Sequence, residues 1–181
     1  MRLFIAIDLP SEIKSRISAA SSNLPKDGAV FVVKELYHIT LQFLGSVRKE
    51  DLTVLDGALK RVSHERFSAG ISGLSYFSPA SLRVVYAAIS SGSAEIISLH
   101  DEICLNLSAS GITYEKEHSY VPHATVARVN RAKNPERTIE SINGQSNVRF
   151  GSFEVLRFVL KESEYINGQL NYRNLREYGL K

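Results

Sequence analysis

The chain has 181 residues, of which 44% are hydrophobic and 23% are charged, with a net charge of +3 and a pI of about 9.0. This length supports one domain or two small lobes around a cleft. The mild basicity is compatible with a polyanionic partner and equally with an ordinary solvated surface. A single cysteine, Cys104, excludes an internal disulfide and a cysteine-based zinc site.

No apolar run approaches the roughly 20 residues that are needed to span a membrane, and the first strand is too short for a secretory signal. We therefore expect a cytoplasmic protein, and a monomer by default. No His-Glu-x-x-His pattern, cysteine pair or dense aspartate cluster predicts a metal site.

The first half of the chain alternates between strand and helix patterns. Ser11 is a plausible N-cap, because Ile13, Ile17 and Ala20 recur on one helical face behind it. Gly45-Ser46 ends an apolar run of strand type. In order, we expect a strand over 3–9, a helix from Ser11, strands over 29–33 and 37–44, and a helix over 49–62.

The second half predicts a strand pair, a long apolar helix that ends at Ser110-Gly111, and a closing hairpin. Pro135 is well placed for the first turn of a short helix, and Asn167-Gly168 is the preferred pair for a tight hairpin turn. We expect strands over 67–74 and 82–89 joined by a turn at 78–81, a loop over 114–120, and strands over 122–129, 152–161 and 169–177.

Two strand-like runs carry the same short pattern, His38-Ile39-Thr40 and His123-Ala124-Thr125. Random placement of the histidines and threonines gives roughly 0.14 such matches, so chance produces two of them on the order of one time in a hundred. Because residues two apart in a strand share a face, each run has a polar face opposite a core face. In the first run we expect His38, Thr40 and Gln42 on the polar face, and Ile39, Leu41 and Phe43 on the core face. An imidazole and a hydroxyl presented twice suggest an acid/base pair around one anionic group.

These residues resemble the RNA 2′,3′-cyclic phosphodiesterases, also called 2′-5′ RNA ligase-like proteins, of the two-histidine phosphoesterase superfamily. The resemblance covers nearly the whole chain: the opening strand, the two motifs, and the closing hairpin. The first motif reads His-Ile-Thr-Leu-Gln-Phe-Leu-Gly over 38–45, and the second is Pro-His-Ala-Thr over 122–125 with Arg128. The family usually has Trp and paired prolines before the first motif. Residues 31–36 here read Phe-Val-Val-Lys-Glu-Leu, so the substrate entrance differs.

The resemblance implies an α+β fold of two antiparallel-rich lobes, related by pseudo-twofold symmetry around a central cleft, within one domain over 1–181. It implies hydrolysis of RNA 2′,3′-cyclic phosphate ends, or of cyclic nucleotides, to 2′-phosphates. His123 would act as base and His38 as acid, and run backwards the site would join RNA ends by 2′-5′ ligation. Thr40 and Thr125 would donate hydrogen bonds to the phosphate, which Arg128 would clamp, without a metal or cofactor.

Arg128 raises a geometric question. Five residues after His123, an ideal strand points it to the opposite face, so reaching the cleft requires a bulge or the end of the strand. The alternative is a solvated surface arginine. Among the aromatic residues, Phe31, Tyr37, Phe43 and Tyr120 could stack on a base, although Phe31 and Phe43 are expected in the core.

Two other classes of function remain open. The chain could be an RNA-binding module without turnover, although such a module has no need for two acid/base groups. It could also be a structural domain with two satisfied histidines, which requires that the motifs lie apart. The remaining histidines, His64, His100 and His118, lack the paired threonine and are expected outside the site.

Overall fold

The computed structural model describes residues 1–181 except 27, 79–81, 117–118 and 131. Its strands are β1 Arg2–Asp8, β2 Ala29–Phe31, β3 His38–Ser46, β4 Phe67–Tyr76, β5 Val84–Ser91, β6 His123–Val129, β7 Arg149–Val155, β8 Arg157–Ile166 and β9 Gln169–Gly179. Its helices are α1 Ser11–Ser21, α2 Leu52–Lys60, α3 Ser93–Ala109 and α4 Pro135–Asn143, with 3₁₀ turns η1 Lys34–Leu36 and η2 Lys49–Asp51.

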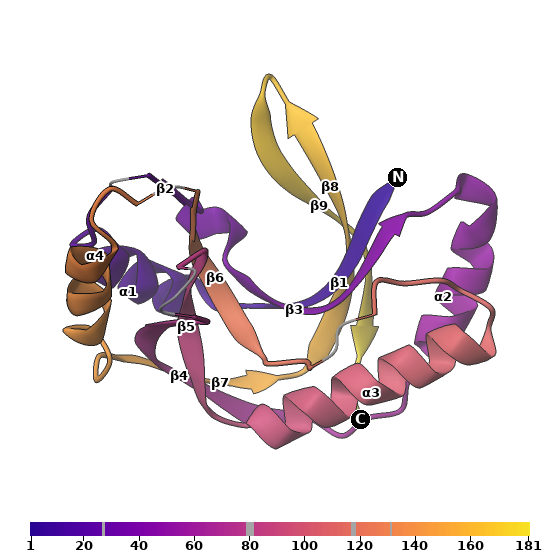
Figure 1. Ribbon diagram of the computed structural model, residues 1–181. Helices are drawn as coiled ribbons and strands as arrows, with labels where there is room; N and C mark the ends of the chain where they lie inside the picture. Colours follow the sequence, from indigo (N-terminus) through magenta and orange to yellow (C-terminus); the bar gives the residue numbers. More distant parts are fainter. Residues whose placement is uncertain (27, 79–81, 117–118, 131) are drawn as a thin grey trace.

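Within the described residues, the strands form one curled antiparallel sheet in the order β7-β4-β5-β6-β3-β1-β8-β9, with β2 also paired to β6 (Figure 1). The strand order is symmetric about the junction of β6 and β3, because each strand on one side has a counterpart at the same distance on the other. The succession β1-α1-β3-α2 matches β5-α3-β6-α4, while β8 and β9 extend one half as β4 and β7 extend the other. The expected pair of lobes about a pseudo-twofold axis is therefore confirmed, and each lobe contributes one motif strand to the centre.

The helices lie in two groups that cover the outside of the curled sheet (Figure 1). Helices α1 and α4 contact the half that contains β4, β6 and β7, whereas α3 contacts β3 and packs against α2. The core faces of the motif strands are fully buried, with Ile39 and Ala124 both at 0% exposure. The helices thus bury one face of the central strands and leave their other face open.

The closing segment differs from the expectation of one strand over 152–161. It is divided at Leu156 into β7, which pairs with β4, and β8, which pairs with β1. The chain therefore crosses here from one half of the sheet to the other. Apolar residues continue through the crossing, so the local pattern carries no sign of it. The turn at Asn167 and Gly168 is confirmed, with φ of 51° and 78°.

Smaller differences concern boundaries. Ser11 is the first residue of α1 rather than its cap, because Pro10 holds the N-cap position. The expected helix over 49–62 begins as the 3₁₀ turn η2 and continues as α2. Residues 79–81 of the expected turn lie outside the described residues. No helix in the described part of the chain is long and apolar enough to cross a membrane.

Gly73 marks a close approach between β4 and the segment before β7. Its φ is +76°, and an added Cβ would lie 2.2 Å from the backbone oxygen of Ser146. Gly111 has a similar φ of +70°, but a Cβ there would meet no atom of the described residues within 4 Å. We expect Gly111→Ala to lower the free energy of unfolding by about 1–2 kcal/mol through backbone strain alone.

Gly73→Ala should lower the free energy of unfolding by about 1–3 kcal/mol more than Gly111→Ala does, because the added methyl group forces two backbone segments apart. Urea denaturation of the two variants measures this difference. Equal losses in the two variants would contradict the close approach.

Candidate active site

The two motif strands meet at the centre of the sheet, where Ile39 of β3 and Ala124 of β6 are antiparallel partners. Because side chains alternate along a strand, the residues that flank this pair turn to the open face. Continuing the register by one residue places Thr125 across from His38, and His123 across from Thr40. All four side chains line one cavity of about 630 Å³.

The two imidazoles are held in the same way. Nδ1 of His38 lies 2.7 Å from the carbonyl oxygen of Leu36, and Nδ1 of His123 lies 2.7 Å from that of Val121. A carbonyl oxygen only accepts, so each Nδ1 carries the proton and donates it. In both rings, Nε2 is therefore the nitrogen that is left to accept a proton.

Aromatic rings flank each histidine. The centroids of Phe4 and Tyr172 lie 5.0 and 5.2 Å from that of His38. The ring centroids of Phe77 and Tyr86 lie 4.9 and 5.3 Å from that of His123. These rings limit how far each imidazole can turn. The hydroxyl of Thr40 lies 3.0 Å from Nε2 of His38 and donates to it when the imidazole is neutral.

Each motif strand carries a bulge three residues after its histidine. Ile5 and Ala6 of β1 pair with Gln42 and Thr40, which leaves Leu41 as an extra residue in β3. A bulge reverses the alternation of faces that follows it. The expectation that Gln42 shares the polar face is therefore wrong: Gln42 is buried on the core side, and Phe43 lines the cavity.

The second bulge has the same position and acts on Arg128. Val85 and Tyr86 of β5 pair with Ala127 and Thr125, so Val126 is the extra residue in β6. The bulge brings Arg128 to the open face, where it lines the cavity with the histidines. In an ideal strand without this bulge, the side chain of Arg128 would point to the opposite face.

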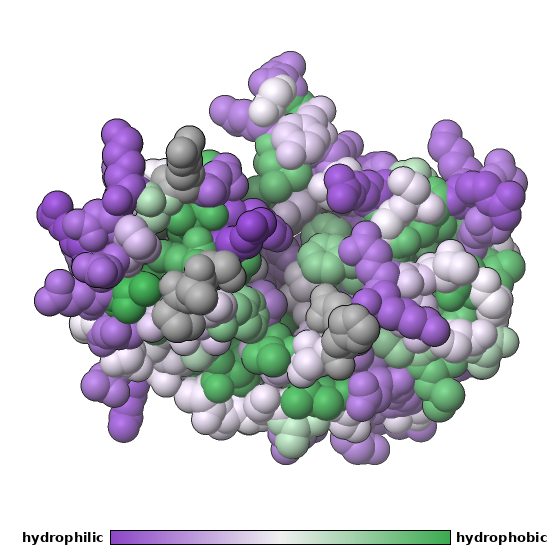
Figure 2. Space-filling model, viewed as in Figure 1, coloured by the Kyte–Doolittle hydropathy of each residue, from purple (hydrophilic) through white to green (hydrophobic). Residues whose placement is uncertain are grey.

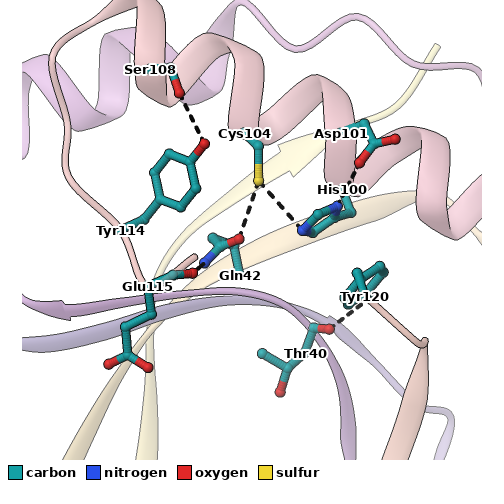
Figure 3. Close-up of polar contacts among 9 residues, drawn as sticks. All are labelled: Thr40, Gln42, His100, Asp101, Cys104, Ser108, Tyr114, Glu115 and Tyr120. Atoms are coloured by element: carbon teal, nitrogen blue, oxygen red, sulfur yellow. Dashed lines mark hydrogen bonds and ion pairs between the residues drawn. The ribbon is translucent and has the colours of Figure 1, made fainter. Parts of the chain in front are cut away.

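Gln42 ties β3 to the chain that precedes the second motif. Its Nε2 donates to the backbone oxygens of Phe43 at 2.9 Å and Glu115 at 2.6 Å. Its Oε1 accepts from Sγ of Cys104 in α3 at 3.2 Å, as Figure 3 shows. Cys104 is half-buried. A buried side-chain amide thus fixes the strand behind the site.

A second set of contacts reaches the site from α3 (Figure 3). Nδ1 of His100 lies 2.9 Å from a carboxylate oxygen of Asp101. The ring of His100 stacks on that of Tyr120, with centroids 4.1 Å apart. The hydroxyl of Tyr120 donates to the backbone oxygen of Thr40 at 2.9 Å. Tyr120 also lines the cavity, so His100 supports the site although it lies outside it.

Burial lowers the pKa of His38 to about 4, from an ordinary value of 6.5. The hydrogen bond to Leu36 opposes this shift, the positive charges of Lys161 and Lys14 add to it, and Asp8 opposes it. Lys161 is itself nearly buried and pairs with Asp8 at 2.9 Å. His38 is consequently neutral at pH 7 when nothing occupies the cavity.

The aromatic candidates divide differently from the expectation. Phe31, Phe43 and Tyr120 line the cavity. The expectation that Phe43 lies in the core is therefore wrong, whereas Phe31 is half-buried and packs against the core as well. Tyr37 is buried at 2% exposure and belongs to the core. Among the other histidines, His64 follows α2 away from the cavity, and His118 lies outside the described residues.

The hairpin of β8 and β9 supplies cavity residues that sequence reasoning missed, namely Tyr165, Gln169, Leu170 and Tyr172. A signal for two of them was present. The tight turn at Asn167-Gly168 fixes the register, and this places Tyr165 and Tyr172 on one face of the hairpin.

In the part of the chain that the structure describes, no three His, Cys, Asp or Glu side chains are grouped to hold a metal ion.

Comparisons with known proteins agree with this architecture. The family model of the 2′-5′ RNA ligase superfamily matches residues 9–164. A protein of Methanocaldococcus jannaschii named RNA 2′,3′-cyclic phosphodiesterase is 31% identical, over 98% of this chain and 100% of its own. One of the same name from Archaeoglobus fulgidus is 32% identical, over 98% and 99%. The crystal structure of Escherichia coli LigT complexed with 3′-AMP has a TM-score of 0.81 at 25% identity, and the match covers 99% of this chain and 97% of that one.

Replacing Gln42 tests its structural role. Gln42→Leu removes the donor to two backbone oxygens and should lower the free energy of unfolding by about 1–3 kcal/mol. Cys104→Ala, which removes only a weak thiol donor to the same amide, should cost less. Urea denaturation compares the two. An unchanged midpoint for Gln42→Leu would show that the amide is not needed to hold β3.

The neutral state of His38 should depend on the contents of the cavity. We expect its imidazole to titrate near pH 4 in the free protein, following the lowered pKa. Inorganic phosphate should raise that pKa, because a nearby anion stabilises the imidazolium. NMR titration of the histidine ring protons, with His38→Ala for assignment, measures both values. A pKa near 6.5 without phosphate, or one that phosphate leaves unchanged, would contradict this electrostatic description.

Proposed function

Because this chain belongs to the 2′-5′ RNA ligase superfamily, we propose that it hydrolyses 2′,3′-cyclic phosphate ends of RNA to 2′-phosphates. The observation that carries the proposal is the convergence of His38, Thr40, His123 and Thr125 on one cavity, with Arg128 on its wall. The relatives named RNA 2′,3′-cyclic phosphodiesterase, which match almost the full chain, support the same activity.

In this mechanism the two histidines act on opposite sides of the phosphorus. Nε2 of His123 takes a proton from water as the water oxygen attacks. The bond from phosphorus to the ribose 3′-oxygen breaks on the far side, and Nε2 of His38 gives that oxygen a proton. One water is consumed, and the phosphate stays on the 2′-oxygen. Positioned acid–base catalysis of this kind contributes about 10²–10⁴-fold for each group.

The acid role requires that His38 become protonated. Its pKa of about 4 leaves it neutral at pH 7, so the negative charge of the bound phosphodiester must raise that value. Once protonated, Nε2 no longer accepts from Thr40. The threonine hydroxyl is then released to donate to a non-bridging oxygen of the phosphate.

Arg128 and Thr125 complete the proposed contacts with the phosphate. The guanidinium is always charged and can bind two phosphate oxygens at once. All the residues invoked come from one chain and from both halves of the sheet. We therefore infer that residues 1–181 act as one domain and that a monomer suffices. Attack by an RNA 5′-hydroxyl on the same cyclic phosphate would give a 2′-5′ linkage by the same chemistry.

Hydrolysis of a short RNA with a 2′,3′-cyclic phosphate end, in the presence of EDTA, tests the proposal. We expect His38→Ala and His123→Ala each to lower kcat by about 10²–10⁴-fold, and His64→Ala to leave it unchanged. Phosphorus NMR should identify a 2′-phosphate product. Turnover that EDTA abolishes would overturn the metal-free mechanism. If wild-type protein binds the RNA without turning it over, the protein is a binding module instead.

A further inference from the structure

We propose that the ion pair between Lys161 and Asp8 controls how readily His38 gives up its proton, which makes both of them positioning residues for the reaction. Each acts through His38 rather than on the substrate. The inference rests on the proposed function, in which His38 protonates the departing ribose oxygen. Lys161 makes the His38 imidazolium a stronger acid, and Asp8 limits that effect.

Asp8 reaches His38 directly across the sheet. The two residues are antiparallel partners, at the end of β1 and at the start of β3. Partner residues present their side chains on the same face of a sheet. The carboxylate therefore stands beside the imidazole on the open face. The bulge at Leu41 lies further along β3 and leaves this pair in register.

Lys161 reaches the same place from β8. Its partner in β1 is Phe4, whose ring lies 5.0 Å from that of His38 between centroids. Nζ of Lys161 nevertheless lies 2.9 Å from the carboxylate of Asp8, four residues further along β1. The lysine side chain therefore runs along β1 past Ala6, whose single methyl group leaves room for it.

The two charges of the pair differ in their contact with water. The β8–β9 hairpin rises beside a hollow at the centre of the face in Figure 2, and Lys161 is buried within this hairpin. Its side chain is 8% exposed, whereas that of Asp8 is 39% exposed. Nζ of Lys161 also donates to Oδ1 of Asn174 at 2.5 Å, which fixes its position. Because water screens the carboxylate more than the ammonium group, the lysine has the larger effect on His38.

A second lysine faces His38 from α1. Lys14 lowers the pKa of His38 as Lys161 does, but its effect is smaller than those of Lys161 and Asp8. Its Nζ donates to the backbone oxygen of Glu35 in η1 at 2.8 Å, and this contact is exposed. The buried lysine of β8 is therefore the main charge that acts on His38.

The remaining groups that face His38 come from its own strand and from β9. Thr40 contacts Nε2 at 3.0 Å, and the ring of Tyr172 meets that of His38 edge to face. Arg128 of β6 is close enough to Tyr172 to oppose the burial-induced rise in the pKa of its hydroxyl. Neither Thr40 nor Tyr172 carries a charge at pH 7, so neither replaces the ion pair.

The pair balances two requirements of an acid catalyst. A stronger acid transfers its proton faster, but only the protonated fraction can act. The positive charge of Lys161 weakens the hold of His38 on the proton, which favours transfer. The negative charge of Asp8 keeps enough of the imidazolium populated once a phosphodiester is bound.

NMR titration of the histidine ring protons, in the free protein and with saturating phosphate, tests the pair. Asp8→Asn leaves the charge of Lys161 uncompensated and should lower the pKa of His38 by about 0.5–1 pH units. Lys161→Met leaves the carboxylate alone and should raise the pKa by about the same amount. The double variant lacks both charges and should return the pKa toward that of wild-type protein. Shifts of one sign in both single variants, or no shift, would overturn the proposal.

Two control variants separate charge from packing. Lys161→Arg keeps the charge and should hold the pKa of His38 close to its wild-type value. Glu162→Gln removes a carboxylate that is paired with Arg173, from the next residue of the same strand, which points to the other face. It should leave both the pKa and kcat unchanged. A shift in Glu162→Gln equal to that in Asp8→Asn would overturn the proposal.

Turnover of a short RNA with a 2′,3′-cyclic phosphate end tests the role in the reaction. At pH 9, on the alkaline side of the expected optimum, kcat is limited by the protonated fraction of His38. We expect kcat there to rise about two- to threefold in Lys161→Met and to fall by about the same factor in Asp8→Asn. Unchanged kcat in both variants would overturn the role in the reaction.

Failure of the proposed function would be visible separately, as the absence of turnover by wild-type protein. The NMR titration needs no turnover. In that case it decides by itself whether the pair of Lys161 and Asp8 controls the proton on His38.

Discussion

The site depends on one contact, the pairing of Ile39 in β3 with Ala124 in β6. Both residues are fully buried, which fixes the direction in which their neighbours point. In a strand with one buried face, a shift of one residue would carry every side chain to the wrong side, so burial specifies the register strongly. The hydrophobic contact between the lobes therefore also sets the polar geometry on the other face.

The bulges bring different residues into the cavity from two otherwise similar halves. Leu41 and Val126 are extra residues at equivalent positions, and each brings the fifth residue after its histidine into the cavity. That residue is Phe43 in one half and Arg128 in the other. A fully symmetric pair of histidines could not distinguish attack from departure. An apolar ring near His38 suits a ribose, while a guanidinium on the side of His123 suits charge, so the different residues that the two bulges bring into the cavity give the site a direction.

The sequence was sufficient to predict the motifs and the closing turn, because each depends on local periodicity or on turn chemistry, whereas the two lobes were implied by the family resemblance. It could not show the bulges, since Leu41 and Val126 are apolar residues that continue the pattern of their strands. Gln42 and Phe43 were consequently placed on the wrong faces. The crossing at Leu156 and the approach of the hairpin to the cavity depend on contacts between distant segments, which no local pattern records.

The lowered pKa of His38 determines when the acid role of His38 and the base role of His123 become distinct. Burial and two nearby lysines keep this imidazole neutral, so the free protein holds no acid on that side at pH 7. An anion bound in the cavity reverses the balance, because its charge lies close to Nε2 of His38 in the same low-dielectric surroundings that lower the pKa. Protonation of His38 and release of the Thr40 hydroxyl then follow from binding. In the proposed mechanism, the substrate itself converts a neutral pair of histidines into one that is ready to transfer a proton.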